Sequence, residues 1–232
     1  CDVHYSNFPM PVYQRFLKDY WPVVSIFVIC GLFFLVDLVT GGSGRSVTAP
    51  LMMVPAEVSA GWQAVLDREL GGDGIFALAT TFTYALLHGD GEHLLMNMLL
   101  IWVFGSLVLR ELGAMWFFGI FVLSAMTGGI GQVLLDPGSP IPTLGASGAL
   151  MGLEGAYLGM AMRWRLPNPD VWPIAEPVPP SRLVILAVVG LVMDMSGVLG
   201  DAGGVAYGAH LGGFVGGALI ATTIIPRPRH AK

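Results

Sequence analysis

Six apolar stretches constrain this chain more than any other feature, because each is close to the length of about 20 residues that a helix needs to cross a bilayer. They run roughly from Pro22 to Gly41, Glu92 to Leu109, Ala114 to Leu135, Gly145 to Met162, Leu183 to Gly200 and Ala206 to Ile225. A lipid core leaves the backbone few choices other than a helix or a closed barrel. The pattern therefore predicts an all-α membrane protein with six transmembrane helices.

The composition agrees with this class and excludes others. Only 12% of the 232 residues are charged and 54% are hydrophobic, whereas soluble domains carry about 25% charged residues. The net charge of -5 argues against the many phosphate contacts that a nucleic acid requires, so we expect no nucleic-acid partner. The two cysteines cannot form a disulfide framework.

Basic residues indicate the orientation of the six spans, because loops rich in Lys and Arg remain in the cytoplasm. If both termini are cytoplasmic, only Arg45 and Arg68 lie outside. The nine others lie inside: Arg15, Lys18, Arg110, Arg163, Arg165, Arg182, Arg227, Arg229 and Lys232. This asymmetry favours an N-in, C-in topology and fits a bacterial inner membrane.

The remaining segments complete the expected organisation. We expect a cytoplasmic N-terminal segment at 1–21, one six-helix membrane domain at 22–225 and a cytoplasmic tail at 226–232. Within the domain, the mixed polar and apolar residues 46–70 suit a loop that lies at the membrane interface, at about 42–90. The apolar stretch Ile75 to Leu87 is too short to span alone, and we expect it to lead into the second span.

Reactive side chains occur at the same position in the three even-numbered spans. Under this topology all three run inward, and His93, Ser147 and His210 each lie about one turn below the outer surface. Polar groups in membrane helices are costly and point to functional sites. Small residues on the fourth and sixth spans, Gly148 and Gly213 among them, allow the two helices to approach closely. The same glycines would also pack a bundle with no catalytic role.

Together these side chains predict acyl-transfer chemistry. Ser147 is a nucleophile if His210, whose pKa range suits a general base, takes its proton. His93 and Asn97 are four residues apart, share one helical face and can donate hydrogen bonds to an oxyanion. The Ser147 backbone amide, at a helix start, is a further donor. Taken singly, each has a structural alternative, such as a serine bonded to its own helix or a His–Asn pair between helices.

The sequence resembles the rhomboid family of intramembrane serine proteases at three motifs. These are HGDGEHLLMN from His88 to Asn97, GASG from Gly145 to Gly148, and GAHLGG from Gly208 to Gly213. The resemblance implies a rhomboid-like bundle of six helices, with Ser147 as nucleophile, His210 as base, and His93 and Asn97 at the oxyanion. It also implies that Gly145 shapes the turn before the serine and that Gly213 lets the sixth helix approach the fourth. His88 is a possible supporting residue.

The resemblance further implies single-pass transmembrane proteins as substrates, cleaved without a metal or organic cofactor. The active site would face the outer side of the membrane, and partners within a membrane complex are possible. The motifs contain no acidic partner for His210, which indicates a Ser-His dyad.

Three positions depart from the family pattern. Met151 replaces a tyrosine that packs on the catalytic histidine, and its sulfur can contact the ring. The first outer loop lacks a Trp-Arg pair, and the acidic residue near the end of the second span is Leu109, with Glu111 two positions later.

Glu154 lies outside the family pattern, in the middle of the fourth span. A hydrogen-bonded structural tie suits it better than the alternative, a polar connection to the active site.

Other functions remain open. A catalytically idle relative could bind membrane segments or serve as a subunit of a membrane assembly, and glycine-rich spans with Glu154 would also suit a small-solute transporter. Asp37 and Asp194 could form an aspartyl pair, but no signature surrounds either. A metalloprotease is less favoured, because the sequence contains no His-Glu-x-x-His helix.

Overall fold

The computed structural model describes residues 12–41, 46–69, 71–168, 179–200 and 205–232. Every regular element in these ranges is helical, with one isolated antiparallel bridge between Met53 and Thr143. Arg45, assigned above to the outer side, lies outside the described residues, and so does most of the expected N-terminal segment. The prediction of an all-α protein is confirmed.

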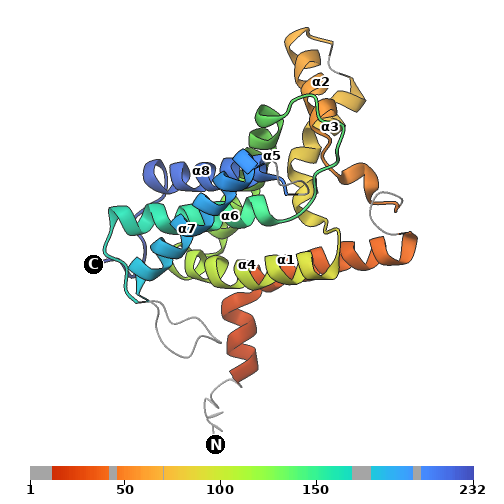
Figure 1. Ribbon diagram of the computed structural model, residues 1–232. Coiled ribbons are helices and arrows are strands. Elements are labelled where there is room, and N and C mark those ends of the chain that lie inside the picture. Colours follow the sequence, from red (N-terminus) through yellow and green to blue (C-terminus); the bar gives the residue numbers. More distant parts are fainter. Residues whose placement is uncertain (1–11, 42–45, 70, 169–178, 201–204) are drawn as a thin grey trace, which may run out of the picture.

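Eight α-helices and two short 3-10 helices make up the described chain (Figure 1). They are α1 (Val12–Thr40), η1 (Ala49–Leu51), α2 (Pro55–Leu66), α3 (Gly72–Thr83), η2 (Tyr84–Leu86), α4 (Gly91–Leu112), α5 (Ala114–Leu135), α6 (Ser147–Arg163), α7 (Pro180–Gly200) and α8 (Tyr207–Thr223). Each of the six apolar stretches lies in its own helix.

Three of the helices in the described ranges are long and apolar enough to cross a membrane by themselves. They are Lys18–Thr40 within α1, Gly91–Leu112 and Ala114–Leu135. α6 and α8 have only 17 residues each, so their length alone does not assign them as spans. The protein is an integral membrane protein with at least these three apolar helices.

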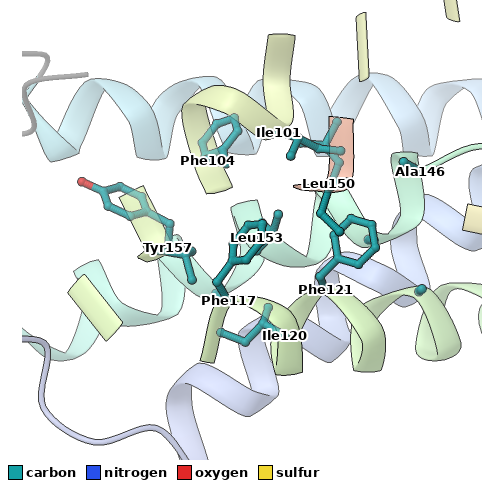
Figure 2. Packing of buried hydrophobic residues seen from close by; sticks show 14 of the residues in the cluster. Ile101, Phe104, Phe117, Ile120, Phe121, Ala146, Leu150, Leu153 and Tyr157 are labelled. Atoms are coloured by element: carbon teal, nitrogen blue, oxygen red, sulfur yellow. The ribbon is translucent and has the colours of Figure 1, made fainter. Parts of the chain in front are cut away.

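Helix α6 lies at the centre of the packing. Its most extensive contact is with α8, and it also packs against α5 and α4. Figure 2 shows Leu150 and Leu153 of α6 beside Phe117, Ile120 and Phe121 of α5. All five are less than 5% exposed. Bilayer-embedded helices associate through such close packing, and it holds the first turn of α6 in a fixed place.

Helix α1 begins ten residues before the apolar stretch predicted at Pro22. Figure 1 shows it as two segments that meet at a sharp bend. Pro22 is the proline inside this helix, and Ser25 Oγ donates to its carbonyl at 2.7 Å. A proline removes an intrahelical hydrogen bond and kinks the helix. We attribute the bend to Pro22.

The segment between the first two predicted spans folds into η1, α2, α3 and η2, which lie at one end of the bundle (Figure 1). Ile75–Leu87 was expected to lead into the second span. It lies in the separate helices α3 and η2, which end before α4 begins. The break has a local cause, because Leu87 is extended and Asp90 caps α4 by accepting a hydrogen bond from the His93 amide at 2.7 Å.

Candidate active site

Ser147 is the first residue of α6, and a strained turn precedes it. Gly145 has a φ of +128°, a conformation that residues with a side chain rarely adopt. Its amide donates to the Tyr84 carbonyl at 3.0 Å, and the Leu150 amide closes the first helical turn on the Ala146 carbonyl at 2.9 Å. The first amides of α6 therefore have no partners within the helix. Ser147 itself is half-buried.

The imidazole of His93 lies against this turn. A Cβ atom on Gly145 would lie 2.7 Å from both Cε1 and Nε2 of His93, and 3.7 Å from Ser147 Oγ. The serine hydroxyl and the histidine ring therefore border the same small space. One helical turn further along α4, Asn97 is 4% exposed, and its side-chain Nδ2 is buried without a hydrogen-bond partner among the residues that the structure describes. An unpaired buried amide is costly and leaves a donor available for a bound group.

His210 lies in the first turn of α8, where its half-buried ring packs edge-on to Tyr207 at a centroid distance of 6.4 Å. The His210 amide donates to the Ala206 carbonyl at 3.2 Å, which starts the helix. A Cβ on Gly148 would lie 3.2 Å from the carbonyl oxygen of Ala209, the residue before His210. The first turns of α6 and α8 are therefore in backbone contact beside Ser147.

Glycines make this approach possible. A side chain on Gly213 would collide with the carbonyl of Gly148, and one on Gly217 with the carbonyl of Gly152. Both pairs join α8 to α6 at successive turns, so the two backbones touch over a long interface. The predicted approach of the two helices rests on these pairs.

His88 is fully buried in the segment that leads into α4. Its ring packs edge-on to His93 with centroids 5.2 Å apart. Among the described residues, neither nitrogen has a hydrogen-bond partner of good geometry, although the Leu86 backbone interacts with the ring. Burial, followed by the neighbouring His93, lowers the pKa of His88 to about 4. His88 is therefore neutral at pH 7, and its ring contacts that of His93.

Two other predicted residues lie deeper in α6. Met151 is 8% exposed and clusters with Ala187 of α7 and with Phe214, one turn after His210 on α8. Glu154 is also 8% exposed and interacts with its surroundings. Its burial agrees with a structural tie.

Asp37 is buried near the end of α1 and accepts hydrogen bonds from the hydroxyls of Ser46 and Thr48. These hydrogen bonds connect Ser46 and Thr48 to the end of α1. The side chain of Asp194 lies outside the described residues.

Sequence reasoning missed Tyr84, which joins three parts of the site. Its carbonyl accepts the Gly145 amide, its hydroxyl donates to the Ala125 carbonyl at 3.1 Å, and a Cβ on Gly148 would lie 2.6 Å from that hydroxyl. No local signal marks such a residue, because its partners are distant in sequence. Asp90 could have been found, since an acidic residue three positions before His93 is a common N-cap.

The chain is similar to known proteins of one family. The family described as Rhomboid domain matches residues 76–227. The chain is 29% identical to RHOMBOID-like protein 5 of Arabidopsis thaliana over 62% of its own length and 43% of that protein. It is 32% identical to the mitochondrial Rhomboid protein 1 of Saccharomyces cerevisiae over 58% of its length and 38% of that protein.

A third relative, Rhomboid protease GluP of Bacillus subtilis, is 38% identical over 34% of this chain and 15% of that protein. The chain thus spans less than half the length of the curated relatives it matches. The family match covers well over half of this chain and includes α4, α6 and α8 with His93, Ser147 and His210. The chain belongs to the rhomboid family.

Proposed function

We propose that this protein is an intramembrane serine protease that hydrolyses peptide bonds of transmembrane proteins with a Ser147–His210 dyad. Ser147 Oγ attacks the scissile carbonyl while His210 takes its proton. His210 then protonates the leaving amine, and water releases the acyl group by the same steps in reverse. His93, Asn97 and the Ser147 amide stabilise the oxyanion.

The observation that carries this proposal is the space in front of Gly145. Ser147 Oγ and the His93 imidazole both border it, the unpaired Nδ2 of Asn97 lies one turn from His93, and the first turn of α8 brings His210 to the same end of α6. These contacts support the assignment of a nucleophile, a base and donors to one helix N-terminus, whose free amides favour negative charge. A packing role alone leaves the unpaired Asn97 donor without an explanation.

The test is reaction of the purified protein with a fluorophosphonate probe. We expect labelling of the wild type and none of Ser147→Ala or His210→Ala. Ser106→Ala is the matched control, because Ser106 is a buried serine of α4 whose hydroxyl has no hydrogen-bond partner within the described ranges. Retained labelling of folded Ser147→Ala would refute the assignment of the nucleophile.

Six spans with both termini in the cytoplasm form part of the proposal. α6, α7 and α8 would cross the membrane together with the three long helices, and the active site would face the outer side of a bacterial inner membrane. The distribution of Lys and Arg supports this orientation. Single-pass membrane proteins would be the substrates, with no metal or organic cofactor.

A catalytically idle membrane-binding protein is the second candidate, because Met151 packs with Phe214 rather than supplying a hydroxyl near His210. It predicts a folded wild type that does not react with the probe. It also predicts that Ser147→Ala leaves binding of membrane segments unchanged.

A further inference from the structure

A cavity of about 580 Å³ lies at the end of the bundle away from Ser147. Its walls come from Lys18–Pro22 of α1, from the turn between α4 and α5, and from Arg229 and His230 of the C-terminal tail. α4 begins beside the candidate active site and reaches this cavity 22 residues later, about 33 Å away at 1.5 Å per residue. That separation is close to a bilayer thickness, so the cavity belongs to the opposite interface.

Several basic side chains line the cavity. Lys18, Arg110 and Arg229 line it, and Asp19 is the acidic residue among its lining side chains. Glu111, on the adjacent turn, is 4% exposed and holds the tail instead. Its carboxylate lies 3.3 Å from His230 Nδ1 and accepts the His230 amide at 3.1 Å. The lining therefore presents more positive than negative charge.

The backbone of Arg229 is held in position by a hydrogen bond. Its amide donates to the Glu111 carbonyl at 2.9 Å. Its guanidinium lies over Gly113, where a Cβ would be 2.5 Å from Nη2 and 3.1 Å from Cζ. Gly113 has a φ of +88° and joins α4 to α5. A residue with a side chain at this turn would displace the guanidinium, which is planar, always charged and suited to binding phosphate oxygens in pairs.

An aromatic side chain borders the charged wall. Trp21 lines the cavity, is 53% exposed and packs against Phe118 of α5 with ring centroids 5.7 Å apart. Exposed tryptophans of membrane proteins lie at the level of lipid headgroups. The cavity therefore combines cationic side chains with the aromatic side chain that marks the headgroup layer.

We propose that this cavity binds the phosphate-bearing headgroup of an anionic phospholipid. Basic pockets between membrane helices on the cytoplasmic side are suited to such headgroups. Lys18 and Trp21 line the cavity just before the bend at Pro22, so the headgroup would connect α1, the α4–α5 turn and the tail. This site is separate from the proposed protease site and does not depend on catalysis.

The test uses the full chain in detergent micelles with brominated phosphatidylglycerol or brominated phosphatidylcholine, which quench tryptophan fluorescence. Arg229→Gln is compared with Arg227→Gln. Arg227 lies two residues away, is exposed and does not line the cavity, so its substitution removes the same charge from outside the site. The wild type should prefer phosphatidylglycerol. Arg229→Gln should reduce that preference at least about fivefold, the effect of one basic residue at an anionic surface, and Arg227→Gln, outside the cavity, should reduce it less.

Further arms separate the alternatives. Lys18→Gln should also reduce the preference, and Arg229→Lys should retain part of it, which guards against a variant that fails to fold. Millimolar inorganic phosphate should not displace the lipid; displacement would mean a site for free phosphate and overturn the proposal. Equal losses in Arg229→Gln and Arg227→Gln, or no preference in the wild type, would also overturn it.

Discussion

At the residue scale, Gly145 limits what the turn before Ser147 tolerates. An alanine there must adopt a φ of +128°, and its Cβ would lie 2.7 Å from the His93 ring. The backbone strain costs about 1–3 kcal/mol, and the ring must also move. We expect Gly145→Ala to slow fluorophosphonate labelling about tenfold or more.

Gly138 provides the matched control, because it lies in the same connection between α5 and α6 and a Cβ there would meet nothing within 4 Å. Gly138→Ala should label at the wild-type rate. If both variants label like the wild type, the turn does not position Ser147.

Asn97 separates catalysis from stability. Its Nδ2 is buried and unpaired, so removing it leaves no new unsatisfied group. We expect Asn97→Ala to lower turnover of a transmembrane substrate by about 10²–10³, the effect of one lost oxyanion donor, with little change in Tm. Ser147→Ala should lose more activity. A large fall in the Tm of Asn97→Ala would instead assign the amide a structural role.

His88 makes stability depend on pH. In the unfolded chain it binds a proton below its ordinary pKa of about 6.5, but in the folded protein only below about 4. Between these values the unfolded state binds more protons, so stability falls as the pH is lowered from 6.5 to 4. Thermal unfolding of the detergent-solubilised protein should show this slope, and His88→Gln should reduce it. An unchanged slope in the variant would exclude His88 as the cause.

The sequence was most informative about residues with unusual chemistry in an apolar context. Ser147, His93 and Asn97 could be selected because a reactive or polar group is rare in a membrane helix, and the turn at Gly145 could be inferred from the family motif. Tyr84 could not, because its role comes from contacts with Ala125, Gly145 and Gly148 that only the folded chain creates.

At the element scale, the contact between α6 and α8 depends on glycines, which have no side chain at the positions where the two backbones touch. A Cβ on Gly217 would overlap the Gly152 carbonyl, so the helices would have to separate. We expect Gly217→Ala to destabilise the protein by about 1–3 kcal/mol, as overpacking does, seen as a lower Tm.

Gly190 of α7 is the control, because a Cβ there would meet nothing within 4 Å. Gly190→Ala should keep or slightly raise the Tm, since alanine favours a helix over glycine. Equal Tm values for the two variants would show that the α6–α8 contact can adjust.

Helix positions followed from hydrophobicity, whereas helix ends depended on single residues. Ala114–Leu135 was predicted with both ends correct. α4 continues three residues past the predicted Leu109, to Leu112, because Gly113 with its φ of +88° ends it. α6 starts two residues after the predicted Gly145, because a φ of +128° keeps Gly145 out of the helix. The length and bend of α1 depend on how Pro22 is accommodated, which hydrophobicity does not reveal.

At the scale of the whole molecule, the orientation can be tested with single cysteines. Gly138 follows α5 on the side of Ser147, and Arg227 follows α8 at the other end. In intact cells, Gly138→Cys should react with a membrane-impermeant maleimide, whereas Arg227→Cys should react only after permeabilisation. The native cysteines are Cys1 and Cys30. Cys30 is buried, and the unsubstituted protein controls for the labelling of both. The reverse pattern would invert the proposed topology.

The short length of α8 has a consequence for the lipid around the molecule. Its 17 residues extend about 26 Å, less than the roughly 30 Å of a hydrocarbon core. Its exposed stripe of Leu211, Val215 and Leu219 is suited to face acyl chains. If α8 crosses the bilayer, this hydrophobic mismatch draws the nearby leaflets together. This local thinning of the bilayer would shorten the path by which water from the outer phase reaches Ser147. The protein would also favour thin membranes over thick ones.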